Sequence, residues 1–377
     1  MDFHSTTLQS LVDQIVEARN ARRCLRIRGG GSKDFYGNAL GNFAVLDTRV
    51  HSGITSYEPS ELVVTAKAGT PLMELEAALL EKNQYLPFEP PNFTPESTVG
   101  GMVAAGLNGA ARASSGSVRD HVLGVQMVSS AADILSFGGT VMKNVAGYDV
   151  SRLLAGSMGT LGLISEVSLK VLPLPVMDRT IGFDVDQAKA ITLMNRWRAL
   201  PLPINSTAWV DARGTKLGRD ALFVRLRGAV AAVESAVSQM TKSHSGYQLP
   251  AEHSPSVWRS ANDHAMSFFV SPAPDLCLWR LSLPATTPPL KVNHPQNIEW
   301  QGAQRWLWAP ASEALALREI ATQAGGHATL FRASVTHSDA DKNVSVFQSL
   351  SPVLSRLNQN LRQQLDPHGV FNTGRMG

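Results

Sequence analysis

RIRGGGSK, residues Arg26 to Lys33, changes within eight positions from apolar and basic residues to three glycines, a hydroxyl group and an amine. Glycine lacks a Cβ atom and adopts positive φ angles easily, so the N–H groups of such a stretch can turn toward an anion and approach it closely. Ser32 and Lys33 add further donors. The stretch predicts a phosphate-binding loop after a strand over 25–28. An ordinary turn is the alternative, because the spacing matches neither a P-loop nor a dinucleotide fingerprint.

Three further glycine-rich elements follow along the chain. They are TVGGMVAAG (98–106), GSVRD (116–120) and a long element from Gly138 to Val167 that contains KNVAGYD (143–149) and GSMGTLG (156–162). At Gly100 and Gly101, small residues would allow a helix N-terminus with free N–H groups to face a second phosphate or a flat ring. Tight helix packing is the alternative for this element. Turns alone do not explain four such elements in succession.

Composition narrows the class of protein. A chain of 377 residues predicts two domains. The 34 basic and 31 acidic residues are scattered along the chain, which argues against a nucleic-acid partner. Two cysteines, Cys24 and Cys277, cannot hold an iron–sulfur cluster or build a disulfide framework, and they suit a reducing cytoplasm. No signal peptide or membrane-spanning run is evident, so we expect a cytoplasmic protein, with peripheral attachment to an inner membrane through partners as the alternative.

Hydrophobic periodicity predicts an α+β fold with a domain boundary near residue 176. In the first part we expect a helix that is capped at Ser5 or Thr6 and ends near Arg22, and a second helix that starts at Thr70-Pro71. Strands are expected over 25–28, 43–47, 62–66 and 122–128. The second part predicts helices over 186–199, 229–241 and 312–323, loops over 243–255 and 284–295, and strands over 181–185, 208–210, 221–226, 276–283, 304–308 and 327–331. A closing helix near 345–365 is expected to return to the first domain.

Taken in order, the motifs RGGGS, TVGGMVA, GSVRD, KNVAGYD and GS-x-GTLG resemble the FAD-binding domain of the vanillyl-alcohol oxidase/p-cresol methylhydroxylase (PCMH) family. Within that family they are most similar to the FAD-binding E subunits of bacterial glycolate oxidase. The resemblance is dense from Leu25 to Pro173, and the closing FNTGRM (371–376) resembles the family's Phe-Asn-Pro-Gly-Arg-Met. It implies a two-subdomain PCMH-type domain over 1–175, a smaller α+β cap over 176–344, and a C-terminal segment, 345–377, that packs back on the FAD domain.

The resemblance also implies which residues contact FAD. The glycine loops would clamp the pyrophosphate and line a slot for the flavin ring. These residues are Arg28, Gly29, Gly30, Gly31, Ser32, Lys33, Pro90, Thr98, Val99, Gly100, Gly101, Met102, Ser117, Asp120, Gly159, Gly162 and Ile164.

Departures from the family pattern carry information too. Members that attach FAD covalently place a His or Cys beside the flavin, whereas here Ser32-Lys33 follows the glycines, so we expect non-covalent FAD. Met158 stands where an acidic residue is usual, and Thr373 where proline is usual. The His-x-Gly-Asp-Gly-Asn motif that supplies a metal site and a base in related 2-hydroxy-acid dehydrogenases is absent, so no metal site is predicted.

Function follows from the resemblance as an expectation. It implies the FAD-binding subunit of a multi-subunit glycolate oxidase, with a homologous FAD-binding D subunit and a cysteine-rich iron–sulfur F subunit as partners. Arg332 is the single catalytic candidate, as a partner for the carboxylate of a small 2-hydroxy acid or for the negative charge at N1 of the reduced flavin. A surface or interface cation is the alternative for this residue. Two alternatives stay open: a self-sufficient FAD oxidoreductase, and a non-catalytic assembly subunit. We expect Trp279, Trp306 and Trp308 to lie in the core or at a subunit interface.

Overall fold

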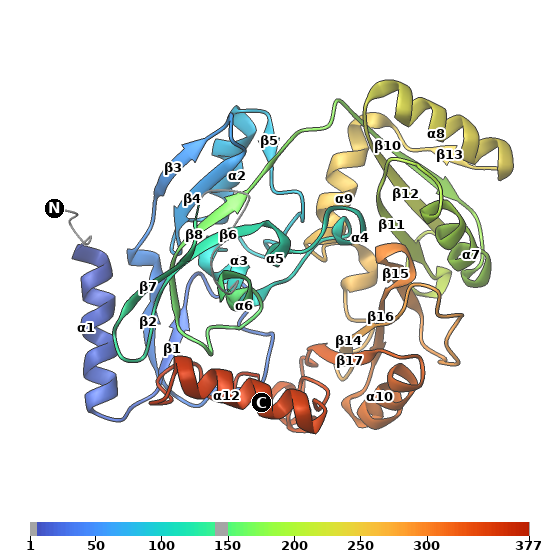
Figure 1. Ribbon diagram of the computed structural model, residues 1–377. Coiled ribbons are helices and arrows are strands. Elements are labelled where there is room, and N and C mark those ends of the chain that lie inside the picture. Colours follow the sequence, from blue (N-terminus) through green and yellow to red (C-terminus); the bar gives the residue numbers. More distant parts are fainter. Residues whose placement is uncertain (1–5, 140–149, 377) are drawn as a thin grey trace. The chain divides into compact units, whose positions relative to one another are not determined.

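The computed structural model describes residues 6–139 and 150–376, which form two compact units (Figure 1). One unit contains residues 6–107, 117–139, 150–174 and 349–376, and the other contains 108–116 and 175–348. Residues 108–116, which the sequence places in the FAD-binding domain, belong to the second unit. The reason is local packing, because Ser114 Oγ donates to the carbonyl of Asn205 at 2.6 Å and the Trp300 indole donates to that of Gly109 at 2.9 Å. The KNVAGYD motif lies outside the described residues.

An antiparallel five-stranded sheet forms the centre of the first unit. Its strand order is β3 (Ile54–Glu58), β4 (Val63–Lys67), β8 (Leu163–Lys170), β6 (Val122–Val128) and β7 (Ile134–Gly138). The helices α2 (Leu72–Glu81) and α3 (Val99–Ala105) bury apolar side chains in the same core. Thr70, which lies at the predicted start of α2, does not cap the helix. Pro71 holds that position, and the Thr70 hydroxyl exchanges hydrogen bonds with Gly53 instead.

A smaller parallel pair, β1 (Leu25–Arg28) and β2 (Ala44–Asp47), completes this unit together with α1 (Thr6–Asn20). Leu11, Ile15 and Phe371 share one hydrophobic cluster with these strands, and Leu25 bridges in parallel to Phe371. The segment around Phe371 therefore lies beside β1, near the start of the chain. The closing helix, α12, covers Pro352–Leu365, and its Leu361 and Leu365 pack against the core of the five-stranded sheet. Short elements of the unit are β5 (Gln84–Tyr85), α5 (Val118–His121), α6 (Val150–Leu154) and β9 (Leu172–Pro173).

The second unit is built on an eight-stranded antiparallel sheet. The strand order is β13 (Tyr247–Gln248), β10 (Met177–Phe183), β12 (Ala221–Gly228), β11 (Ile204–Val210), β15 (Gln296–Glu299), β16 (Gln304–Ala309), β14 (Cys277–Ser282) and β17 (His327–Arg332). Helices α7 (Gln187–Arg198), α8 (Val230–Ser243) and α10 (Ala314–Gln323) bury their apolar faces on it. The helices and strands predicted for the cap are confirmed, with ends that differ by a few residues.

Several elements of this unit were not predicted, among them β13, β15 and α9. Strand β15 has only four residues and follows a loop. Helix α9 (Ser254–Asn262) begins inside a segment that its Pro, Ser and His content assigns to a loop. Pro255 is compatible with a helix there because the first turn needs no N–H donor from it. No helix among the described residues is long and apolar enough to cross a membrane.

The three tryptophans of the sheet are buried, but they do not form one cluster. Trp279 lies opposite Leu307 and joins the hydrophobic core beneath α10. Trp306 and Trp308 alternate with Leu307, so they point to the other face of the sheet. There Trp306 contacts Phe331 edge-on, with a centroid separation of 4.9 Å. The prediction of a core role is confirmed.

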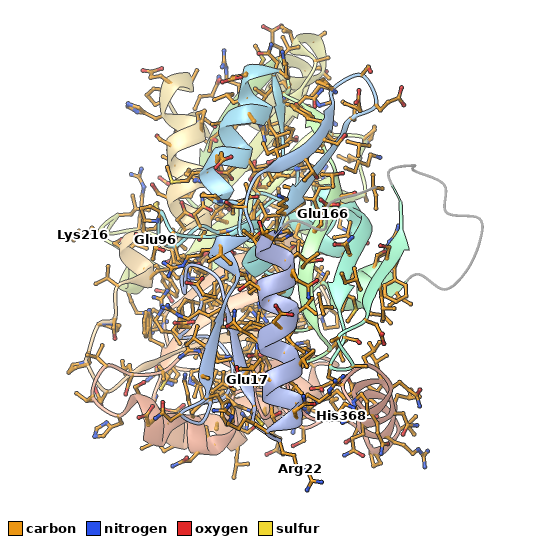
Figure 2. All side chains as sticks on the ribbon, turned by 90° about the vertical axis from the view of Figure 1, so that its left-hand side faces the viewer. Glu17, Arg22, Glu96, Glu166, Lys216 and His368 are labelled. Atoms are coloured by element: carbon orange, nitrogen blue, oxygen red, sulfur yellow. The ribbon has the colours of Figure 1, made fainter. Side chains whose placement is uncertain are left out.

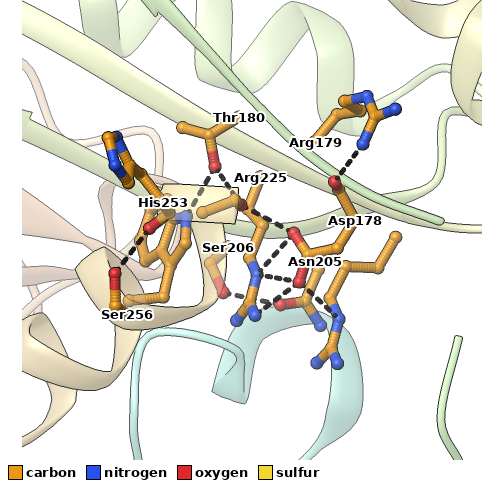
Figure 3. Close-up of polar contacts among 11 residues, drawn as sticks. Asp178, Arg179, Thr180, Asn205, Ser206, Arg225, His253 and Ser256 are labelled. Carbon is orange, nitrogen blue, oxygen red and sulfur yellow. Dashed lines mark hydrogen bonds and ion pairs between the residues drawn. The ribbon is translucent and has the colours of Figure 1, made fainter. Parts of the chain in front are cut away.

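A buried polar network ties α9 to the edge of this sheet (Figure 3). Asp178 on β10 accepts hydrogen bonds from Arg225 on β12, at 2.6 Å from Nη2, and from Ser254 at 2.7 Å. Arg227 lies 3.3 Å from the same carboxylate. The Arg225 and Arg227 side chains are only 5% and 10% exposed, so Asp178 neutralises cations that water hardly reaches.

Candidate cofactor-binding site

A pocket in the first unit lies between β1 with the glycines that follow it, helix α3, the segment 158–164 and the segment 372–375. It is lined by Arg26, Ile27, Arg28, Gly29, Gly30, Gly31, Ser32, Lys33, Asp34, Leu40, Thr48, Ala68, Thr98, Gly100, Gly101, Ala104, Ala105, Met158, Gly159, Gly162, Ile164, Asn372 and Arg375. The structure thus brings together, in one pocket, the predicted residues of the first glycine loop, three of the second element and three of the last. Asp34, Ala104, Asn372 and Arg375 are among the lining residues that were not predicted.

The first glycine loop packs too closely against its neighbours to carry side chains. A Cβ atom at Gly30 would lie 1.5 Å from the carbonyl oxygen of Glu96, and one at Gly29 would lie 2.3 Å from Thr98 Oγ1. Gly31 has a φ angle of +75°, which favours glycine. Within the described residues, the backbone N–H groups of Gly30, Gly31 and Ser32 donate no hydrogen bond. They therefore remain available to an anionic group, as the sequence predicts.

Helix α3 contributes differently from the prediction. Its first N–H groups are occupied: Val99 donates to the Thr70 carbonyl at 2.9 Å, Gly100 to the Ala68 carbonyl at 2.8 Å, and Gly101 to Thr98 Oγ1 at 3.2 Å. The expectation of free N–H groups at this helix is therefore wrong. What α3 offers the pocket is a surface of small residues, Gly100, Gly101, Ala104 and Ala105. Such a surface suits a flat group better than a phosphate.

Positive charge dominates the lining. Four cationic side chains and one carboxylate face the pocket. The carboxylate, Asp34, is shared by Arg26 at 2.8 Å and Arg28 at 2.7 Å. The Lys33 ammonium lies 3.1 Å from Ser32 Oγ and 3.4 Å from Ser97 Oγ. An excess of cations beside unused N–H groups fits a ligand with two phosphate charges.

The C-terminal segment completes the pocket. The Asn372 side chain accepts a hydrogen bond from the N–H of Ile27 at 2.9 Å and donates to the carbonyl of Met158 at 2.7 Å. It thereby fixes β1 to the last glycine-rich element. Arg375 donates to the carbonyls of Asn38 at 2.9 Å and Asp34 at 2.8 Å. Burial, with repulsion from Arg26, lowers the pKa of Arg375 to about 10, so this guanidinium stays charged at neutral pH.

We expect the Asn372→Ala variant to be less stable than the wild type by about 2–3 kcal/mol, because the substitution leaves the Ile27 N–H and the Met158 carbonyl without their partner. Denaturant unfolding measures the change. Asn358→Ala is the matched control, because the Asn358 amide is exposed on α12 and bonds only within its helix. Equal stability of the two variants would contradict the structural role of Asn372.

Five of the predicted residues do not line the pocket. Val99 and Met102 point into the hydrophobic core, and Pro90 is buried in a loop. Ser117 and Asp120 form a capping box at the start of α5, with the Ser117 N–H and hydroxyl both 2.8 Å from Asp120 Oδ2. Burial opposes ionisation of Asp120, but the hydrogen bonds from Ser117 outweigh it and hold the pKa of Asp120 below its usual value. Ser117 and Asp120 thus hydrogen-bond to each other and do not line the pocket.

Arg332, the catalytic candidate, ends β17 in the second unit and is not among the residues of the pocket. Burial lowers the pKa of its guanidinium. The described residues contain no group of His, Cys, Asp or Glu side chains suited to hold a metal ion.

Comparison with known proteins finds similarity to glycolate oxidase subunits and to an FAD binding domain. The chain is 41% identical over 368 residues to glycolate oxidase subunit GlcE of Escherichia coli K12, an alignment that covers 98% of this chain and 97% of that protein. A family model for an FAD binding domain matches residues 3–138. Glycolate oxidase subunit GlcD of Bacillus subtilis is 29% identical over 188 residues, covering 46% of this chain and 40% of that protein. A solved structure of alkyldihydroxyacetonephosphate synthase shares the fold, with a TM-score of 0.67 and 14% sequence identity. The match covers 98% of this chain and 74% of the synthase chain.

Proposed function

Since this chain belongs to the family of glycolate oxidase E subunits, a family of FAD-dependent oxidoreductases, we propose that it is the FAD-binding subunit of a multi-subunit enzyme that oxidises glycolate or a similar small 2-hydroxy acid. The observation that carries the proposal is the pocket beside the first glycine loop. Its unused N–H groups and its cations fit the pyrophosphate, and the small residues of α3 fit a flat ring. The oxidation yields the 2-oxo acid and releases two electrons and two protons.

In this proposal, a bound FAD would supply hydride and electron acceptance to the complex, and the FAD of this chain would serve as a structural or electron-transfer group. The chain's own residues bind and orient it. Gly30, Gly31 and Ser32 would donate backbone hydrogen bonds to the phosphates, and Lys33 and Arg28 would balance their charge. Gly100 and Ala104 would form the surface that contacts the ring. Covalent flavin links are usually made to a His or Cys side chain, and neither Ser32 nor Lys33 is one of these. The Cys24 thiol donates a hydrogen bond to the Gly369 carbonyl. We therefore propose that FAD is held non-covalently.

We further propose that a homologous D subunit carries out the oxidation and that a cysteine-rich F subunit carries the electrons away. The absence of the His-x-Gly-Asp-Gly-Asn motif supports this division, and the two cysteines of this chain cannot ligate a cluster.

Arg332 supports the second candidate, a chain that oxidises its substrate alone. Burial of this guanidinium on the cap sheet would strengthen its pairing with a substrate carboxylate. In either case we place the protein in the cytoplasm, with any membrane attachment made through its partners.

The visible absorption spectrum of the purified chain tests these proposals. Under anaerobic glycolate, we expect flavin bands that do not bleach with the isolated chain and that bleach once the D subunit is added. Acid denaturation should release the flavin into the supernatant. Bleaching of the isolated chain at the rate of the whole complex would favour the self-sufficient enzyme, and flavin that stays with the precipitate would rule out non-covalent binding. A chain free of flavin even after co-expression with its partners would be an assembly subunit.

A further inference from the structure

A second pocket of the first unit is lined by Arg19, Asn20, Arg22, Arg23, His368 and Val370, and shares no residue with the cofactor pocket. Its volume is about 550 Å³. It lies where the end of α1 meets the turn before the closing motif, and Figure 2 shows Arg22 and His368 at this same end of the helix. Three arginines therefore gather at one small surface that the proposed function does not use.

Contacts within the first unit explain the positions of two of the three arginines. Arg23 pairs with Glu17 at 2.8 Å, and Arg19 donates to the carbonyl of Ala131 at 2.7 Å. Cations near a helix C-terminus also interact favourably with the helix dipole. These contacts account for Arg19 and Arg23 but leave Arg22 unexplained, because its side chain makes no hydrogen bond or ion pair with the described residues.

The backbone of Arg22 makes this residue unusual. Arg23 N–H donates to the Ala18 carbonyl at 2.8 Å and Arg22 N–H to the Arg19 carbonyl at 3.0 Å, which is the hydrogen-bond pattern of a Schellman motif. Arg22 occupies the position that is usually glycine, with a φ angle of +52°. A side chain there strains the backbone. An arginine at this position therefore costs stability that its own visible contacts do not recover.

We propose that Arg19, Arg22, Arg23 and His368 form a second anion-binding site, which takes a phosphate group carried either by a soluble molecule or by a lipid headgroup. Glu17, already paired with Arg23, is the one carboxylate bonded to a lining arginine within the described residues, so positive charge prevails at the pocket. The Asp366 carboxylate, close in sequence to His368, is occupied by the N–H groups of Val370 and Phe371 at 2.9 Å. Guanidinium groups of arginine match phosphate oxygens in geometry and charge.

The substitution Arg22→Gly tests this site without endangering the fold, because glycine is the favoured residue at that backbone position. We expect its melting temperature to equal or exceed that of the wild type while anion binding is lost. The experiment uses the full chain with saturating FAD, so that the phosphate-binding groups of the cofactor pocket are filled. Calorimetry measures the binding of inorganic phosphate, and co-sedimentation measures binding to vesicles with or without phosphatidylglycerol.

We expect Arg22→Gly to weaken binding at least about tenfold in one of these two measurements, whereas Arg198→Gln, which removes an exposed cation at the end of α7, leaves both unchanged. An effect on phosphate alone identifies a soluble phosphorylated ligand, and an effect on phosphatidylglycerol vesicles identifies a lipid headgroup. The proposal is overturned if neither probe binds the wild type, or if Arg22→Gly binds both as tightly as the wild type does.

Discussion

The Gly30→Ala variant is expected to be purified with less than about a tenth of the FAD of the wild type. One added carbon suffices, because it would lie 1.5 Å from the Glu96 carbonyl oxygen and neither backbone can yield without opening the pocket. Moving this loop also withdraws the N–H groups of Gly31 and Ser32 from the phosphates. A tenfold loss of affinity corresponds to about 1.4 kcal/mol, and the geometry predicts at least that. The ratio of flavin to protein absorbance measures the loss.

Gly139→Ala is the matched control for this substitution. Gly139 follows β7 in the same unit, and a Cβ atom there would meet nothing within 4 Å. We expect this variant to retain full flavin content. Circular dichroism of both variants should match the wild type, which separates loss of the cofactor from loss of the fold. A folded Gly30→Ala variant with stoichiometric FAD would show that the cofactor lies elsewhere.

The Asp178→Ala variant is expected to lose about 3–5 kcal/mol of unfolding free energy, the largest effect on stability that we predict. Removing this carboxylate leaves the guanidinium groups of Arg225 and Arg227 buried without their counter-charge. It also leaves Ser254 without its acceptor. Asp184→Ala is the control, because its partner Arg219 is 52% exposed and such pairs contribute at most about 1 kcal/mol. Denaturant unfolding of the two variants should differ clearly, and equal losses would contradict this account.

Asp178 should also make stability depend on pH. Burial opposes its ionisation, but the hydrogen bond and charge of Arg225 outweigh burial and hold the pKa of Asp178 below its usual value. A carboxyl group whose pKa is lower in the folded state binds its proton first in the unfolded chain. Its contribution is therefore complete above about pH 5 and lost as pH falls through and below about 4. In Asp178→Asn the unfolding free energy should fall less steeply over that range. If the unfolding free energies of Asp178→Asn and the wild type fall equally steeply below about pH 5, Asp178 is not the source of the pH dependence.

The glycine loops and the helices of the cap could be predicted from sequence because each depends on local chemistry. Three glycines after a strand predict close backbone approach, and Gly30 shows such an approach to Glu96. The apolar repeat of α7 predicts a buried helix face, which the structure confirms. In both cases the residues that determine the feature lie within a few positions of one another.

The features of the pocket that were not predicted depend mainly on contacts between segments that are distant in the sequence. Asn372 and Arg375 line the pocket because the chain end bridges to Leu25, which no local pattern indicates, although their FNTGRM motif was a signal that could have been used. Ser117 and Asp120 were assigned to the cofactor by motif resemblance, whereas their mutual spacing of three residues is also the signature of a capping box. The N–H groups of α3 were expected to be free, but the Ala68 and Thr70 carbonyls of the preceding segment occupy two of them.

The position of Asn372 and Arg375 has a consequence for biosynthesis. β1, α3 and the element around Met158 emerge from the ribosome long before residues 372–375, yet all of them line one pocket. Until that late segment is translated, the Ile27 N–H and the Met158 carbonyl lack the side chain that joins them. Nascent chains should therefore bind FAD only after residues 372–375 have been translated, so we expect cofactor binding to follow the synthesis of both units.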